Sequence, residues 1–105
     1  MSIRIATALE LPAAALGEYA RRHDEIWDAV RDSIRDSGGR NMSIFALPEC
    51  DRVVMYVEVS SLEAWAASGA TELTRAWWRY MAEIMPSNPD GSPLSTAMPE
   101  LFHQD

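Results

Sequence analysis

The first residues of the chain are rich in Ile, Ala and Leu, and larger, mostly apolar side chains alternate there with alanine or charged residues. On an extended backbone, this alternation places every second side chain on the same face, which is typical of a β-strand. We therefore predict a strand from Ile3 to Leu11. The side chains on one face of this strand are Ile3, Ile5, Thr7 and Leu9. Pro12 suits the first position of a following helix, because the backbone N–H that proline lacks would have no partner there.

The segment from Ala13 to Ser37 changes to apolar spacings of three and four residues, the period of an α-helix. The apolar stripe consists of Leu16, Tyr19, Ala20, His23, Ile26, Trp27, Val30 and Ile34. Charged residues cover most of the remaining surface. Gly38 and Gly39 end the helix, because glycine accepts the positive φ found at helix C-termini. The pattern therefore predicts one long amphipathic helix.

Two further strands are predicted, from Asn41 to Leu47 and from Arg52 to Val59. A turn from Pro48 to Asp51 separates them. The second of these strands has the sequence RVVMYVEV, in which the β-branched and aromatic residues that favour strands dominate. Both of its faces carry apolar side chains. A layer of helices can cover only one of these faces.

A second helical region follows the third strand. Ser60 stands three residues before Glu63, the spacing of a capping box at a helix start. Gly69 interrupts the helix, Thr71 restarts it, and apolar spacing continues to Pro86. We therefore expect a second helix that is interrupted at Gly69.

The last part of the chain is predicted to be a loop followed by a short strand. The loop, Pro86 to Pro93, contains three prolines and a glycine, and Leu101 to His103 could form the strand. The element order predicts an α+β fold, a ferredoxin-like β-α-β-β-α-β antiparallel sheet with helices on one face. Pairing of two sheets across a homodimer would cover the other face, since so large an exposed apolar area is unusual in a monomer.

Composition narrows the function. The 105 residues suit a single domain that spans residues 1–105. The formal charge of −7 argues against binding of nucleic acids or anionic membranes. A single cysteine, Cys50, and the absence of a signal-like or membrane-spanning apolar run indicate a cytoplasmic protein. No zinc spacing or phosphate-binding glycine loop occurs, so we expect no metal and no cofactor.

His23 and Tyr19 are the first candidates for chemistry. They stand four residues apart, so both side chains lie on the apolar face of the predicted helix. An imidazole titrates near neutral pH and can accept or donate a proton there. The alternative is a histidine of the core that has a single hydrogen bond. Arg22, beside His23, fits a solvated helix surface better than a pocket.

Trp77 and Trp78 are adjacent on the predicted second helix, so they point in directions about 100° apart. One can pack in the core while the other lines the edge of a pocket, where flat aromatic rings suit the C–H faces of sugars. The alternative is that both belong to the core. Glu58 is a carboxylate in an apolar strand and must be paired or face a cavity.

Two segments of the chain resemble the L-rhamnose mutarotase family. Tyr19–Trp27 resembles the Y-x-x-R-H-x-x-[IV]-W helix of that family. Trp77–Met81 and Met85–Asp90 resemble its C-terminal signature. The resemblance extends from the first strand to about Phe102 and needs almost no gaps. The combination of the two motifs is far more specific than either motif alone.

The resemblance implies a ferredoxin-like domain that dimerises into an α/β barrel, and an isomerase that interconverts the α and β anomers of L-rhamnose without metal or nucleotide. It implies that His23 is the proton donor and that Tyr19, Trp77 and Trp78 contact the sugar. A further sugar-contacting tyrosine of the family falls on Met42, which has no hydroxyl. One hydrogen bond to the sugar is then lost or supplied by another group. The expected substrate is L-rhamnose or a related deoxy sugar.

The mechanistic hypothesis is that His23 protonates the ring oxygen while Tyr19 positions a hydroxyl or relays a proton. The base is Glu58, Asp90 or a water molecule. Two other functions remain open at this point. Dimeric ferredoxin-like domains also include cofactor-free monooxygenases, and the chain could be a non-catalytic sugar-binding or dimerisation module.

Overall fold

The computed structural model describes residues 2–105. An antiparallel sheet of four strands forms one layer, with the strand order β2-β3-β1-β4. The strands are β1 (Ile3–Glu10), β2 (Arg40–Leu47), β3 (Arg52–Val59) and β4 (Ser95–Met98). The α+β class and the antiparallel sheet are therefore confirmed.

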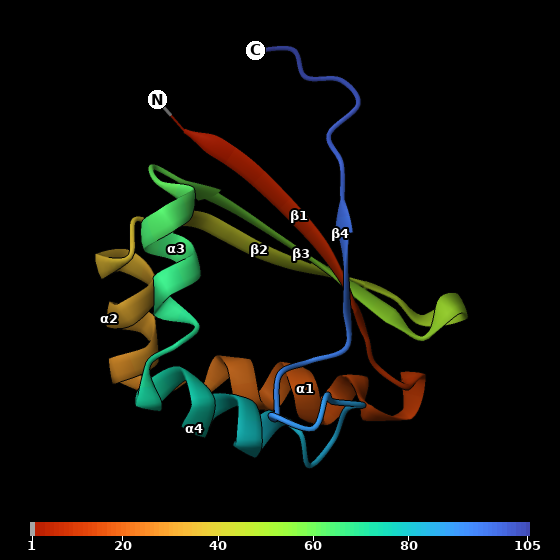
Figure 1. Ribbon diagram of the computed structural model, residues 1–105. Coiled ribbons are helices and arrows are strands. Elements are labelled where there is room, and N and C mark those ends of the chain that lie inside the picture. The colour runs from red at the N-terminus through yellow and green to blue at the C-terminus, as the bar shows by residue number, and fades with distance from the viewer. Residues whose placement is uncertain (1) are drawn as a thin grey trace.

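The helices form the second layer and lie on one side of the sheet (Figure 1). They are α1 (Leu16–Asp24), α2 (Asp28–Asp36), α3 (Leu62–Ser68) and α4 (Glu72–Met81), with short 3-10 turns at Ala13–Ala15 and Pro48–Cys50. Among residues 2–105, no helix is both long and apolar enough to cross a membrane.

The alternation of side chains along β3 decides where the core lies. Val53, Val57 and Val59 face the helices and are almost completely buried. Their burial against the apolar faces of the helices contributes the hydrophobic free energy that holds the two layers together. Val54 and Tyr56 alternate with these residues and lie on the opposite face, which no helix covers. The predicted division into a covered and an uncovered face is confirmed.

The single long helix predicted from Ala13 to Ser37 is wrong. The chain leaves the helical conformation after Asp24 and starts α2 at Asp28, with Trp27 extended at φ −60° and ψ 133°. At this break, the Trp27 ring contacts those of Trp77 and Tyr80, with centroids 5.1 and 5.6 Å away. Apolar spacing continues on both sides of the break, so periodicity alone could not locate it.

Two other boundaries differ from the prediction. The final strand is β4, not Leu101–His103, because β4 pairs with β1 while Leu101 is 93% exposed. The cap of α3 is Ser61 rather than Ser60, since its Oγ accepts a hydrogen bond of 3.1 Å from the Ala64 N–H. The predicted interruption at Gly69 and the restart at Thr71 are confirmed, although α4 ends at Met81, before Pro86.

Candidate active site

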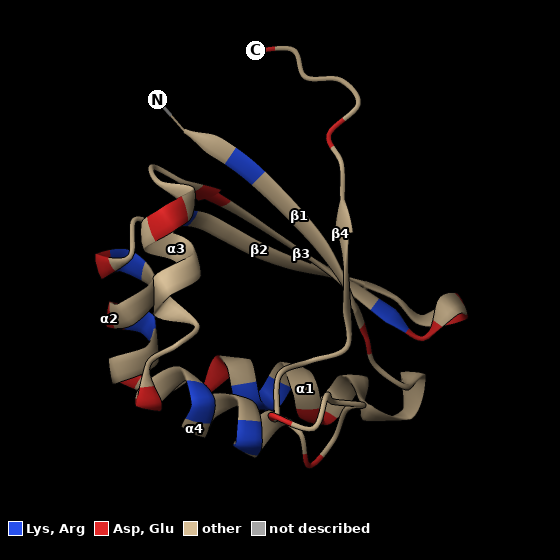
Figure 2. Ribbon diagram, viewed as in Figure 1, with Lys and Arg blue, Asp and Glu red and all other residues tan. Residues whose placement is uncertain are grey.

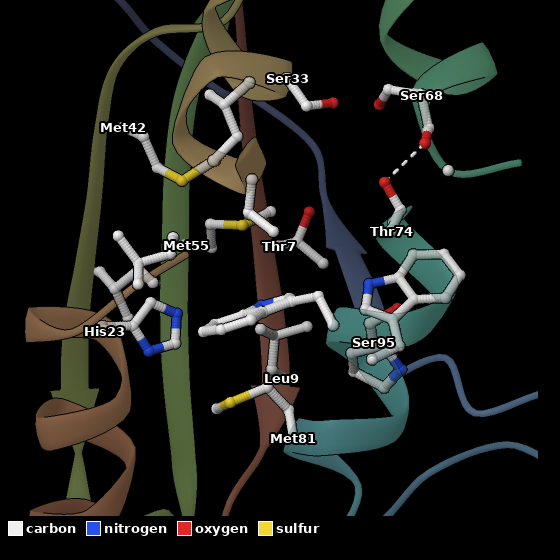
Figure 3. Close-up of a pocket in the computed structure, with 18 of the residues that line it drawn as sticks. Thr7, Leu9, His23, Ser33, Met42, Met55, Ser68, Thr74, Met81 and Ser95 are labelled. Atoms are coloured by element: carbon white, nitrogen blue, oxygen red, sulfur yellow. Dashed lines mark hydrogen bonds between the residues drawn. The ribbon is translucent and has the colours of Figure 1, made fainter. Parts of the chain in front are cut away.

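A cavity of about 360 Å³ lies between the sheet and the helices (Figure 3). This volume falls within the range of small-molecule pockets. Its walls come from all four strands, from all four α-helices and from connecting segments such as the one that contains Pro93. Its aromatic, hydroxyl and sulfur-bearing lining residues, with Ile44 beside them, include Thr7, Tyr19, His23, Ser33, Met42, Ile44, Met55, Ser68, Thr74, Trp77, Trp78 and Ser95.

All five site residues predicted from the sequence line this cavity. Tyr19 and His23 come from α1, Met42 from β2, and Trp77 and Trp78 from α4. Segments far apart in the sequence thus meet at one place. The placement agrees with the predicted site, although the role of each residue stays a prediction.

Charged side chains avoid the cavity. Among the described residues that line it, none is an arginine, an aspartate or a glutamate. Figure 2 shows that many charged positions lie along helices α1, α2 and α4. An ionic ligand would therefore find no partner of opposite charge in this cavity. The lining suits a neutral ligand that offers both apolar surface and hydroxyl groups.

One nitrogen of the His23 imidazole is engaged, and the other forms no hydrogen bond with residues 2–105. Its Nδ1 lies 3.0 Å from the backbone carbonyl oxygen of Tyr19. A carbonyl can only accept, so Nδ1 carries the hydrogen and Nε2 has the free lone pair when the ring is neutral. Burial lowers the pKa of His23, and the hydrogen bond to the Tyr19 carbonyl opposes this effect in part. His23 is therefore a neutral base at pH 7.

Tyr19 lies next to His23 and is also part of the site. The two ring centroids are 4.4 Å apart. Tyr19 is only 6% exposed, and burial raises the pKa of its hydroxyl to about 12. The phenol therefore remains protonated at neutral pH, where it can donate a hydrogen bond but is a weaker acid than an exposed tyrosine.

Trp77 is fixed in place by the rings around it. Its indole meets the His23 ring edge-on, with centroids 5.6 Å apart at 90°, and it also contacts Trp27. Trp78 is half-buried and lines the cavity beside Gly69. The two tryptophans point in different directions, as predicted, yet both reach the cavity because it wraps around one side of α4. Neither one is only a core residue.

The expectation of a solvated Arg22 is wrong. Arg22 is 9% exposed, and its Nη1 donates a hydrogen bond of 2.6 Å to the backbone carbonyl of Tyr80 on α4. Its Nε donates to Glu18, 2.7 Å away, and the guanidinium lies 4.0 Å from the centre of the Tyr80 ring. An arginine can cover aromatic surface while it keeps its hydrogen bonds, which a simple polar pattern does not reveal. Arg22 joins the helix that carries His23 to the helix that carries both tryptophans.

The two carboxylates considered as the base do not line the cavity. Glu58 lies on the uncovered face of the sheet, where Asn41 and Tyr56 donate hydrogen bonds to it and lower its pKa. Asp90 accepts a hydrogen bond of 2.9 Å from the Ser92 N–H in the loop after α4, so it shapes a turn. Glu58 and Met55 stand three residues apart on β3, so they lie on opposite faces of the sheet, and Met55 is the one that faces the cavity. In the described part of the chain, no cluster of His, Cys, Asp or Glu that could hold a metal ion occurs.

Sequence reasoning missed the hydroxyl side chains of the cavity, among them Thr7 on β1 and Ser33 on α2. A signal was present for Thr7, because it is the polar member of a face otherwise formed by isoleucine and leucine. Ser33 gave a weaker signal, since a serine next to a helical apolar stripe is common on exposed surfaces.

Comparisons with known proteins agree with the motifs. A family model described as L-rhamnose mutarotase matches residues 4–104. An L-rhamnose mutarotase of Tolumonas auensis is 44% identical over 101 residues, which is 96% of this chain and 97% of that protein. One from Lachnoclostridium phytofermentans is 36% identical over 98% of this chain and 99% of its own length. A crystal structure of L-rhamnose mutarotase from Formosa agariphila superposes with a TM-score of 0.88 at 31% identity, covering 98% of this chain and 99% of that one.

More distant structures share the fold alone. A putative antibiotic biosynthesis monooxygenase from Caulobacter crescentus has a TM-score of 0.64 at 13% identity, covering 96% of this chain and 91% of that one. Identity this low carries no functional inference. The monooxygenase alternative therefore rests on architecture, whereas the mutarotase resemblance rests on architecture and sequence together.

Proposed function

The chain belongs to the L-rhamnose mutarotase family, and we propose that the cavity is where it interconverts the α and β anomers of L-rhamnose, with His23 as the proton-transferring residue. The observation that carries this proposal is an imidazole with one free nitrogen in a cavity walled by two tryptophans. The uncharged lining supports a neutral sugar as the ligand.

Mutarotation moves one proton between two oxygens. In ring opening, the anomeric hydroxyl loses its proton, the bond from the anomeric carbon to the ring oxygen breaks, and the ring oxygen gains a proton. Closure on the other face of the carbonyl reverses these changes and yields the other anomer. A base and an acid that act together lower the barrier, typically by about 10²–10⁴-fold.

The hydrogen bond at Nδ1 of His23 supports a role for its Nε2 as the base in ring opening. The neutral Nε2 accepts the anomeric proton, while a proton reaches the ring oxygen from water, either directly or through a relay in which the Tyr19 hydroxyl gives up one proton and takes up another. In ring closure the protonated His23 is the donor, so a single residue acts as base in one direction and acid in the other. This assignment replaces Glu58 and Asp90, which lie away from the cavity. It also changes the sequence-based hypothesis that His23 protonates the ring oxygen, because a neutral imidazole accepts a proton before it can donate one.

Trp77 and Trp78 supply the apolar walls against which the C–H groups of the sugar can lie. Met42 adds a further apolar contact but no hydroxyl to bind. The sugar is thus held by aromatic surface together with hydrogen bonds from other side chains of the cavity.

The decisive experiment measures anomer exchange of L-rhamnose by NMR saturation transfer. The His23→Ala variant should lose about 10²–10⁴-fold of the enzyme-dependent exchange rate. His103→Ala is the matched control, because His103 lies at the exposed end of the chain, and it should exchange at the wild-type rate. A folded His23→Ala protein that exchanges the anomers as fast as the wild type would remove His23 from the mechanism.

We further infer that the partner of this chain is a second copy, bound through the uncovered face of the sheet. Phe45, Leu47 and Met98 on that face are 65%, 47% and 42% exposed. Exposed apolar area of this kind marks an association surface in many proteins. Like the cytoplasmic location expected from the single cysteine, the homodimer stays a prediction.

A further inference from the structure

The hydroxyl groups of the cavity fall into two kinds. Ser68 donates a hydrogen bond of 2.6 Å to the backbone carbonyl of Trp65, and Thr74 donates one of 2.7 Å to the carbonyl of Ser68. The hydrogens of these two hydroxyls are thus engaged within the protein. Thr7, Ser33 and Ser95 also line the cavity and form no side-chain hydrogen bond with the described part of the chain. Ser95 is exposed at the start of β4, whereas Thr7 and Ser33 are half-buried and their oxygens are still accessible to solvent. Their hydroxyls remain available to a ligand.

Thr7 belongs to the floor of the cavity. In the sheet register, Thr7 lies opposite Met55, and Met55 lies opposite Ile44 on the next strand. These three side chains form a row across the sheet and all line the cavity. Thr7 supplies the hydroxyl of this row, so it is a polar point in an apolar floor. Polar groups at such positions fix the orientation of a bound ligand.

Ser33 comes from the helical wall above this floor. It stands three residues after Val30 and next to Ile34, and all three line the cavity from α2. Figure 3 shows the Thr7 and Ser33 hydroxyls directed toward one region of the cavity, away from the His23 ring. The site therefore has a proton-transferring end and a separate hydroxyl-bearing end.

The shape of a pyranose matches these two ends. The anomeric carbon and the ring oxygen are neighbours, and the hydroxyls on C3 and C4 project from the opposite side of the ring. A sugar whose anomeric centre lies at His23 extends its C3 and C4 hydroxyls away from that histidine. We propose that Thr7 and Ser33 bind these hydroxyls and are specificity-determining residues for the sugar. This inference rests on the proposed function.

The same arrangement accounts for Met42. A thioether is a weak acceptor and donates no hydrogen bond, so Met42 contributes little to the recognition of a hydroxyl. Thr7 and Ser33 lie in the same cavity and provide hydroxyls that can take over that recognition. Thr7 and Ser33 then select the sugar through its C3 and C4 hydroxyls, which are remote from the anomeric carbon.

The test compares L-rhamnose with its 3-deoxy and 4-deoxy analogues in the NMR exchange assay. The wild type should prefer L-rhamnose by roughly tenfold in kcat/KM for each hydrogen bond that the analogue cannot form. Thr7→Val and Ser33→Ala should each lower kcat/KM for L-rhamnose by roughly tenfold. Each substitution should leave kcat/KM unchanged for one of the two analogues, the one that lacks the hydroxyl bound by the substituted residue. Both substitutions suit their elements, since valine favours strands and alanine favours helices.

Two variants serve as controls. Thr7→Ser keeps a hydroxyl and should keep the preference for L-rhamnose. Ser68→Ala removes a hydroxyl whose hydrogen is bonded within the protein, so the ratio between L-rhamnose and its analogues should not change. If Thr7→Val and Ser33→Ala affect all three sugars equally, the inference is wrong while the mutarotase function stands. If the wild type exchanges none of the sugars, the proposed function itself is wrong.

Discussion

His23 shows how burial sets the working form of one residue. The pKa of its imidazole is lowered below the ordinary value of 6.5 because the ring is removed from water, so the neutral base predominates at pH 7. We expect enzyme-dependent anomer exchange to be constant near neutral pH and to fall as the pH drops through this lowered pKa. The measurement is an exchange rate recorded by saturation transfer across that range, corrected for the uncatalysed rate.

The same shift links His23 to stability. The unfolded chain binds a proton at His23 at a higher pH than the folded chain does, so the folded state loses stability as the pH falls below about 6.5 and through the lowered folded pKa. His23→Gln removes this titration and should show a smaller loss in urea unfolding over the same range. An equal loss in the variant and the wild type would show that His23 is not desolvated in solution.

At the scale of elements, Arg22 connects α1 to α4 and thereby sets His23 against the tryptophans. Arg22→Met keeps the length of the side chain but removes the hydrogen bonds to the Tyr80 carbonyl and to Glu18. We expect a clear loss of unfolding free energy and weaker sugar binding. The control is Arg35→Met, since the Arg35 side chain is exposed and its ion pair within the described residues is with Asp32 on its own helix. That control should change stability by no more than about 0.5 kcal/mol, and a similar small change for Arg22→Met would contradict the proposed connection.

The junction between α2 and β2 depends on a residue without a side chain. A Cβ at Gly39 would lie 2.8 Å from the Trp65 ring and 2.9 Å from the backbone oxygen of Ile34. Gly39→Ala should therefore destabilise the fold by about 1–3 kcal/mol through overpacking. Gly17→Ala is the matched control, because nothing lies within 4 Å of its added Cβ. In thermal unfolding, the Gly17 variant should match or exceed the wild type while the Gly39 variant melts earlier.

The elements that the sequence predicts well are those whose signals are local. The β-branched run of β3 and the restart of the helix at Thr71 depend on neighbouring residues, and both were identified correctly. The break before Trp27 was missed because it depends on rings contributed by α4. The final strand was placed too late, because the apolar side chains of Leu101 and Phe102 suggested a buried strand. In the structure, both side chains are exposed.

The candidate site could be predicted to a similar extent. Tyr19 and His23 share a helix face by spacing alone, and Trp77 and Trp78 were candidates from their place on the second helix. The family resemblance added Met42. The positions of Arg22 and Glu58 depended on packing between elements, which spacing does not contain. Glu58 illustrates this point, since one step in strand register decides whether its carboxylate faces the cavity or the uncovered face.

At the scale of the whole molecule, a single helical layer covers one face of the sheet. That arrangement creates the cavity between the layers, and it also leaves the opposite face without a cover (Figure 1). The site and the predicted association surface therefore lie on opposite faces of the same strands. Substitution of β2 side chains on the uncovered face should therefore change the association of two chains more than it changes the cavity.

Phe45 is the residue with which to test assembly, because it is 65% exposed and pairs across the sheet with Val54 on the uncovered face. In size-exclusion chromatography with light scattering, the wild type should have twice the mass of one chain. Phe45→Glu places a charge in the proposed interface, and burial of an unpaired charge is unfavourable enough to shift the equilibrium toward the monomer. Leu62→Glu is the control, because Leu62 is 55% exposed but lies on α3, in the helical layer, and that variant should remain a dimer. A wild type that stays monomeric at high concentration would show that the apolar face of the sheet does not bind a second copy.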